Sequence, residues 1–306
     1  VCPRGHQQQS YTPTGSNGMK YTSVYGYVGI YTEYEPFVVE GVNEAGLSAG
    51  LFFFPNYGQY TPYNSDQNDR TICDMQFVSW VLSQFDSIDQ LKAALSKVNV
   101  VTLNHKIGAV HWRVAEPGGR MIVLEFVNGV PQIYENTLGV LTNSPGFMWH
   151  MTNLNNYVNL RSGSAADHTL KPGVTLMALG HGSGMLGLPG DFTSPSRFVR
   201  AAFFQTTAPV QPTGFDTVVL AFHLLNNFDL PIGIQDAAED IPKNLPSATQ
   251  FTAVTDQNAV RLYYRTAWNS TIRCIDLMQI NFHSVKFQSH PLDNSQVQPV
   301  EMVKVK

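Results

Sequence analysis

The chain has 306 residues and a formal net charge of −4, and only 14% of its residues are charged. A chain of this length can bury a large core without covalent staples. The lack of a basic field excludes a typical nucleic-acid partner.

Cysteine usage and hydropathy narrow the class of protein further. The three cysteines, Cys2, Cys73 and Cys274, are too few and too widely spaced for a disulfide framework or a CxxC zinc pair. Cys73 and Cys274 stand in apolar runs, where we expect buried thiols. No stretch is long and apolar enough to span a bilayer, and we expect no membrane partner. With neither a signal peptide nor an initiator Met, the compartment stays open between the cytoplasm, which is favoured, and the periplasm.

The first hundred residues predict strands followed by helices. Residues 21–31 are aromatic and β-branched, and residues 38–42 and 47–55 flank the turn Asn43-Glu44-Ala45-Gly46, which predicts a hairpin. Residues 74–98 have apolar side chains at helical spacing and predict two helices. Ser87, with Gln90 three residues later, predicts a capping box for the second helix.

The rest of the chain also predicts strands followed by helices, and then a last group of strands. Strands are expected at 110–114, 121–126 and 140–141, with turns at 116–119 and at Asn128-Gly129. Residues 146–192 have little periodicity, and so long a segment is usually functional or interfacial. A helix is expected after Ser194-Pro195 and another capped by Asp216, followed by strands at 249–254, 260–266 and 272–277. Hairpins and paired helices without a linker or repeat predict one layered α+β domain.

Three motifs indicate ordinary structure. Residues 182–187 match GxGxxG, but Leu188-Pro189-Gly190 blocks the helix that a dinucleotide site needs, so a loop packed against a neighbour is expected. Ser183 is not in a nucleophile elbow, because Met185 occupies the position of the last glycine. The nine histidines show no metal spacing, and His111 and His223 are expected to be core histidines.

Asn143 and Arg197 stand out as candidates for chemistry. A neutral amide and a fixed cation are what an amide-cleaving site needs for a developing oxyanion. Asn143, two residues before Pro145, could equally cap a turn. Arg197 stands at the start of a helix, where a cation opposes the macrodipole, so we expect it to face an anion such as a carboxylate or a substrate.

At these two residues the chain resembles the choloylglycine hydrolase family, the bacterial bile salt hydrolases and penicillin V acylases. Segments similar to family signatures follow one another in family order at residues 3–5, 41–47, 142–145, 151–157 and 184–193. The resemblance covers nearly the whole chain. It implies a single domain over 1–306 with a four-layer αββα sandwich of two antiparallel sheets between helix layers, in the N-terminal-nucleophile (Ntn) hydrolase class. It also implies no cofactor and a homotetramer in which residues 151–190 form an assembly loop; the residue spacing itself gives no metal site.

The resemblance assigns roles to individual residues. A cysteine exposed by processing attacks the amide carbonyl, with its own α-amine as base. Asn143 matches the amide that stabilises the oxyanion. Arg197 matches the arginine near the nucleophile, where a permanent charge can lower the thiol pKa. We expect Tyr31 and Phe53 to bind the acyl part of a small amphipathic amide.

The chain departs from the family pattern in three places. By register, roughly thirty residues, including the hairpin with the nucleophilic cysteine, should precede Val1. Cys2 falls in a later segment, and Pro3 constrains its backbone. Phe53 replaces the usual Asn or Tyr, which favours an apolar acyl group. The connection at residues 102–107 is shorter than in many bile salt enzymes, which predicts a more open mouth.

These observations favour one hypothesis for the function and leave two alternatives open. The first hypothesis is an amidase that cleaves N-acyl amino acid conjugates such as conjugated bile salts or penicillin V, without an order between the two. The alternative is a non-catalytic family member that binds an amphipathic acyl ligand without hydrolysis. A truncated chain is a third possibility, and loss of the first hairpin would expose apolar sheet edges.

Overall fold

The computed structural model describes residues 1–306 except 104–107, 235, 238, 241–247 and 306. Its strands before the long irregular segment are β1 (Gln7–Gln9), β2 (Lys20–Thr22), β3 (Tyr27–Tyr31), β4 (Val38–Asn43), β5 (Ser48–Phe53), β6 (Thr71–Cys73), β7 (Asn99–Val101), β8 (Val110–Ala115), β9 (Met121–Val127) and β10 (Val130–Glu135). The later strands are β11 (His168–Lys171), β12 (Val174–Leu176), β13 (Phe251–Asp256), β14 (Arg261–Thr266) and β15 (Arg273–Asp276). The helices are α1 (Phe77–Gln84), α2 (Ile88–Leu95), α3 (Phe147–Asn153), α4 (Ser194–Thr207) and α5 (Gly214–Leu225).

The largest sheet has six strands in the order β10-β9-β8-β5-β4-β3, and every neighbouring pair is antiparallel. The predicted hairpin at residues 38–55 is confirmed as β4 and β5. Its turn is held by Asn43, whose Oδ1 accepts the N–H groups of Ala45 and Leu47. Asn43 Nδ2 donates to the carbonyl oxygens of Leu82 and Phe85, which ties the turn to α1.

One face of this sheet packs against α1 and α2. The shared core contains the fully buried side chains of Leu82, Leu91, Trp112, Ile122 and Leu124. Leu82 comes from α1 and Leu91 from α2, at the apolar spacing that predicted these helices. The hydrophobic effect therefore fixes this helix layer on the sheet.

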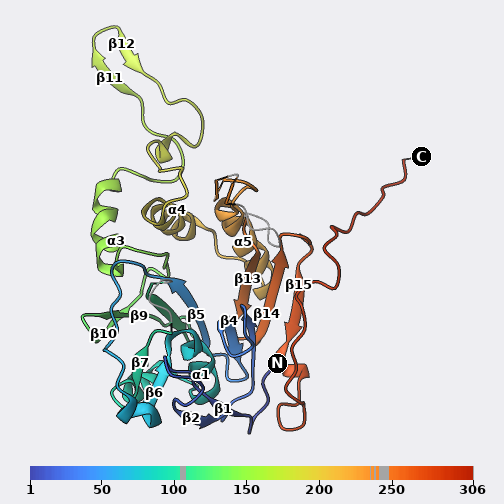
Figure 1. Cartoon of the computed structure of the whole chain (residues 1–306). Coiled ribbons are helices and arrows are strands. Elements are labelled where there is room, and N and C mark those ends of the chain that lie inside the picture. The colour runs from blue at the N-terminus through green and yellow to red at the C-terminus, as the bar shows by residue number, and fades with distance from the viewer. Residues whose placement is uncertain (104–107, 235, 238, 241–247, 306) are drawn as a thin grey trace.

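The opposite face packs against a second antiparallel sheet, in the order β13-β14-β15. Val28 and Val42 of the first sheet meet Leu262 of the second in one apolar cluster. The far face of the second sheet is covered by α5, whose Val218 and Phe222 pack against Tyr263. The order is therefore helix, sheet, sheet, helix, and the αββα prediction is confirmed (Figure 1).

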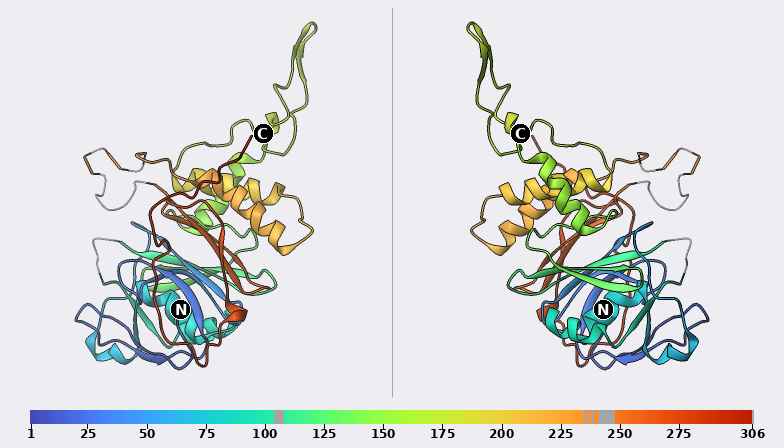
Figure 2. Two further views of the ribbon diagram at one scale, coloured as in Figure 1. Left: turned by 90° about the vertical axis from the view of Figure 1, so that its right-hand side faces the viewer. Right: turned by 90° about the vertical axis from the view of Figure 1, so that its left-hand side faces the viewer.

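The chain between α3 and α4 projects from these layers. Figure 2 shows the β11–β12 hairpin standing away from the body in both side views. Every residue of β11 and β12 is exposed. None of the helices among the described residues combines the length and apolar character needed to cross a membrane.

Two predicted helix caps are wrong. At α2 the Ser87 side chain makes no capping hydrogen bond. The N–H of Ile88, the first residue of the helix, donates to Glu116 Oε2 at 2.8 Å, and Gln90 Oε1 accepts the N–H of Asp86 at 3.2 Å. At α5 the cap is Thr213, whose Oγ1 accepts the N–H of Asp216 at 3.1 Å, so Asp216 lies inside the first turn.

Other expectations fail for similar local reasons. Residues 140–141 form no strand, because the Asn136 side chain takes the carbonyl oxygen of Val140 at 2.9 Å. His223 lies on the exposed face of α5, and Cys274 is exposed on β15, so neither is a core residue. Cys73 is buried as predicted. The predicted short connection at 102–107 lies partly outside the described residues.

The core between the first sheet and its helices should dominate stability. Ile122 is 0% exposed in that core, whereas Ile232 is 81% exposed. Ile122→Ala should lower the free energy of unfolding by about 2–5 kcal/mol, because it leaves a cavity among packed side chains. Urea denaturation measures the change, with Ile232→Ala as the matched control. Equal losses for the two variants would contradict this assignment of the core.

Candidate functional site

The structure brings Asn143 and Arg197 into direct contact. Arg197 Nη2 donates to Asn143 Oδ1 at 2.7 Å, and Arg197 Nε donates to the carbonyl oxygen of Phe192 at 3.0 Å. Asn143 Nδ2 donates to the carbonyl oxygen of Phe53 at 2.9 Å. A guanidinium can only donate, so Oδ1 must face Arg197 and the NH₂ group must face Phe53. The arginine therefore determines the orientation of the carboxamide.

The start of α4 positions Arg197. Asp191 precedes the helix and accepts hydrogen bonds from Ser196 Oγ at 2.6 Å and from the N–H of Thr193 at 2.9 Å. These hydrogen bonds lower the pKa of Asp191 to about 2. Pro195 stands in the first turn, as predicted. The resulting rigid turn places the guanidinium beside Asn143.

The electrostatic state of Arg197 is unusual. Burial lowers the pKa of its guanidinium, and the neighbouring Arg200 lowers it further. Within the described ranges no carboxylate forms an ion pair with Arg197, and the acceptors it meets are neutral oxygens. A half-buried cation with neutral partners is suited to act on an anion that comes from elsewhere.

Asn143 and Phe53 line a common cavity of about 760 Å³. Most of the other lining side chains are apolar or aromatic: Tyr11, Tyr34, Phe37, Val39, Leu51, Phe52, Met75 and Leu103. A cleft of this size and character suits a ligand with a large apolar part and a few polar contacts. The Phe53 ring is half exposed in the cavity, while its carbonyl oxygen holds Asn143.

Tyr31 and Cys2 lie elsewhere. Both line a separate cavity of about 320 Å³. The Tyr31 hydroxyl is 2.8 Å from Ser289 Oγ, so the structure does not bring Tyr31 together with Phe53. Cys2 is buried, and burial raises the pKa of its thiol, which keeps it in the neutral form. Neither residue reaches the cavity that Asn143 lines.

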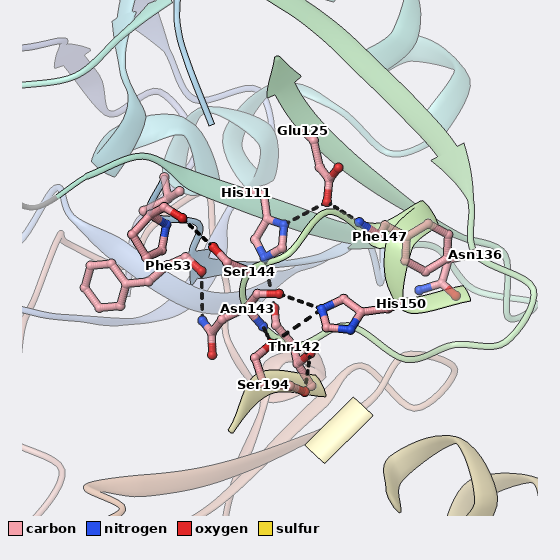
Figure 3. A network of polar contacts seen from close by, with 12 residues as sticks. Phe53, His111, Glu125, Asn136, Thr142, Asn143, Ser144, Phe147, His150 and Ser194 are labelled. Carbon is pink, nitrogen blue, oxygen red and sulfur yellow. Dashed lines mark hydrogen bonds and ion pairs between the residues drawn. The ribbon is translucent and has the colours of Figure 1, made fainter. Parts of the chain in front are cut away.

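Sequence reasoning missed a buried polar network around the backbone of Thr142 and Asn143 (Figure 3). His111 on β8 lies between Glu125 on β9, at 3.1 Å, and the carbonyl oxygen of Thr142, at 2.9 Å. His150 on α3 lies 2.9 Å from the carbonyl oxygen of Asn143. The prediction that His111 is a satisfied core histidine is confirmed. The available signal was one buried ionisable residue in each of two strands, His111 in β8 and Glu125 in β9, whose other buried residues are apolar.

A buried carboxyl group also lines the cavity. Asp74 precedes α1, is 2% exposed, and accepts the N–H of Met75 at 2.9 Å. Burial raises the pKa of Asp74 to about 6, although the hydrogen bonds that it accepts oppose the shift. No group of three His, Cys, Asp or Glu side chains suited to a metal ion occurs within the described part of the chain.

Comparison with known proteins identifies relatives of this chain. Residues 2–295 match the profile of the linear amide C–N hydrolases, choloylglycine hydrolase family. A bile salt hydrolase/transferase from Clostridium perfringens is 33% identical over 282 residues, which cover 90% of this chain and 84% of that protein. A bile salt hydrolase/transferase from Lactiplantibacillus plantarum is 32% identical over 274 residues, covering 88% and 82%.

Solved structures agree with this sequence match. The C2A mutant of the conjugated bile acid hydrolase from Clostridium perfringens superimposes with a TM-score of 0.83 and 30% identity, over 99% of this chain and 90% of that one. Penicillin V acylase from Agrobacterium tumefaciens gives a TM-score of 0.72 at 22% identity, over 92% and 78%, and shares the fold.

The titration of Asp74 should be visible in the pH dependence of stability. Between its ordinary pKa of 3.8 and about 6 in the fold, the folded chain keeps a proton that the unfolded chain releases. Stability should therefore fall as pH rises through this window, by up to about 3 kcal/mol relative to Asp74→Asn.

Urea titrations at several pH values between 4 and 7 measure this difference, with the exposed Asp66→Asn as control. A constant difference between the wild type and Asp74→Asn across the window would show that Asp74 titrates normally.

Proposed function

The chain belongs to the choloylglycine hydrolase family of linear amide C–N hydrolases, and from that premise we propose that it cleaves the amide bond of N-acyl amino acid conjugates such as conjugated bile salts or penicillin V. The observation that carries the proposal is the hydrogen bond from Arg197 to Asn143 beside a large apolar cavity. Amide hydrolysis creates negative charge on the carbonyl oxygen, and the carboxamide supplies a neutral donor for it.

The carboxamide of Asn143 has the donor capacity that this role requires. Nδ2 carries two hydrogens, and the carbonyl oxygen of Phe53 takes one of them. The other would donate to the substrate oxygen as the carbonyl becomes tetrahedral. Because Oδ1 accepts from a cation, the N–H groups become stronger donors. The charge of Arg197 adds long-range stabilisation to the same intermediate.

The nucleophile in this proposal is a cysteine at a free N-terminus, which processing exposes in a segment before Val1. The α-amine of this cysteine takes the thiol proton, and the sulfur bonds to the carbonyl carbon of the substrate. The α-amine then gives that proton to the nitrogen of the substrate amide, and the amino acid part of the substrate leaves as the C–N bond breaks. Water then hydrolyses the thioester to release the acid and regenerate the thiol. Arg197 would keep the pKa of the attacking thiol low.

The cavity favours an apolar acyl group. Its aromatic and aliphatic walls can bury a steroid or an aryloxyacetyl group, and the Phe53 side chain offers neither a donor nor an acceptor. The curated relatives are named for bile salts and one structural neighbour for penicillin V, so these are the two substrates to test.

A second candidate function is binding of an amphipathic acyl ligand without hydrolysis. The apolar lining of the cavity supports it, since such a wall can hold an acyl group whether or not a bond is cleaved. Among the described residues, Cys2 lines the other cavity, Cys73 is buried beside Asp74, and Cys274 is exposed on β15. For a pure binder, calorimetry would detect conjugated bile salt or penicillin V binding with no release of product over many hours.

We further propose that the segment at residues 151–190 is an assembly loop of a homotetramer. Its hairpin β11–β12 projects from the body and packs on no other layer (Figure 2). It exposes large apolar side chains, among them Leu170, Leu176, Met177, Leu179 and Leu186. Several large apolar side chains exposed on one projecting segment are typical of a protein–protein interface.

Activity tests the catalytic proposal. The natural reading frame, including any residues that precede Val1, should release glycine or taurine from conjugated bile salts or phenoxyacetic acid from penicillin V. Asn143→Ala should lower kcat about a hundredfold to a thousandfold, because it removes an oxyanion donor. The exposed Asn155→Ala is the matched control and should retain the wild-type rate.

Two results would contradict the mechanism. One is an unchanged kcat for Asn143→Ala. The other is an unchanged rate when the cysteine of the preceding segment is replaced by alanine.

Sedimentation tests the assembly. The double variant Leu176→Glu and Leu179→Glu should sediment as a smaller species than the wild type, because charges at the apolar hairpin oppose its burial. Val210→Glu is the control, since Val210 is 99% exposed and lies outside the loop. A wild type that sediments as a monomer would overturn the assembly proposal.

A further inference from the structure

Three buried ionisable side chains lie around the backbone of Thr142 and Asn143 and have no part in the chemistry proposed above. His111 and His150 are 0% exposed, and Glu125 is 2% exposed. They come from two neighbouring strands of the first sheet, β8 and β9, and from helix α3, and they converge on one stretch of backbone (Figure 3). Burying such groups is costly unless they are fully engaged, which raises the question of what they hold.

The two histidines hold consecutive backbone carbonyls. His111 Nε2 is 2.9 Å from the oxygen of Thr142, and His150 Nε2 is 2.9 Å from the oxygen of Asn143. A carbonyl can only accept, so each Nε2 carries a hydrogen. Between these carbonyls, the N–H of Asn143 donates to Ser194 Oγ at 2.9 Å. The peptide planes on both sides of the Asn143 Cα atom are therefore anchored.

The rings themselves are held in place. His111 stacks on Phe54 with centroids 4.4 Å apart, and His150 stacks on Phe198 at 4.6 Å, both within 10° of parallel. Glu125 Oε1 meets His111 Nδ1 and also accepts the N–H of Phe147 at 2.8 Å, at the start of the helix that carries His150. One carboxylate thus links both clamps.

We propose that His111, His150 and Glu125 are positioning residues, which clamp the backbone at Thr142–Asn143 so that the Asn143 carboxamide keeps its place between Arg197 and Phe53. None of the three lines the cavity, so they act through Asn143 and not on the substrate. The value of such a clamp is preorganisation, since a donor that is already in place needs no rearrangement when the oxyanion forms.

His150 acts as a neutral donor in this arrangement. Its Nδ1 is buried and has no hydrogen-bond partner among the described residues, so a hydrogen there would be unsatisfied. Burial also lowers the pKa of His150, and the nearby His111 and Arg197 lower it as well, against the opposing influence of Asn143 and Glu125. One hydrogen on Nε2 is all that the clamp requires.

A matched pair of variants at position 150 tests the clamp. His150→Phe keeps the ring and its stacking on Phe198 but removes the donor, whereas His150→Gln supplies an N–H near the position of Nε2. For the natural reading frame, His150→Phe should lower kcat about tenfold to a hundredfold with little change in KM, because the carboxamide loses its exact position. His150→Gln should restore most of kcat.

This inference rests on the proposed function, so a second readout is independent of turnover. In asparagine-selective ¹⁵N spectra, the Asn143 side-chain resonances, assigned by their loss in Asn143→Asp, should be sharp in the wild type and in His150→Gln. They should be broadened or shifted in His150→Phe. An inactive wild type with this pattern would overturn the hydrolase proposal and keep the clamp.

The clamp is overturned if the Asn143 resonances are the same in His150→Phe and in the wild type. It is also overturned if His150→Gln and His150→Phe lose kcat equally, or if the loss appears only in thermal stability.

Discussion

The site depends on the guanidinium of Arg197, which is half-buried and forms no ion pair with a carboxylate among the described residues. Burial works against the charged form of Arg197, and the start of α4 is an unfavourable place for a cation. The fold holds it nonetheless, through neutral oxygens of Phe192 and Asn143. That contact determines which end of the carboxamide faces the cavity, and the rest of the site is built around this choice.

The packing of the layers explains how such a contact is maintained. Asn143 is on an irregular segment beside the first sheet, Arg197 is on α4, and Phe53 is at the end of β5. No single element carries the site. The clamp of buried histidines joins β8 and β9 to α3. The segment before Pro145 is therefore held by hydrogen bonds from the first sheet and from α3. Rigid support on several elements is what a preorganised site needs.

Periodicity predicted most of the architecture. The hairpin of β4 and β5, the helices α1 and α2, and the late strands all follow from apolar spacing and turn residues, because each element buries one face. The resemblance to family signatures placed Asn143 and Arg197 in one site, and the contact between them agrees with it. These features are local, or depend on a face that must be buried.

What the sequence did not predict depends on partners distant in the chain. At the start of α2, Glu116 from the connection after β8 accepts the N–H of Ile88, and the Ser87 side chain makes no capping hydrogen bond. The segment at 140–142 forms no strand, because its carbonyl oxygens accept hydrogen bonds from side chains. Asn136 donates to Val140, and His111 donates to Thr142. The resemblance predicts Tyr31 and Phe53 in one acyl pocket, yet the two residues line different cavities. The local sequence pattern cannot show which side chain, distant in the chain, forms a hydrogen bond with a given backbone group.

The hydrogen bond between Asn143 and residue 53 has a consequence for diversification. The main-chain oxygen at that position steadies the carboxamide, while the aromatic ring forms part of the cavity wall. Because any amino acid supplies the same oxygen, the wall can be redesigned at this codon without loss of the anchor. Residue 53 is therefore a natural starting point for libraries that seek new acyl preferences on an unchanged reaction centre.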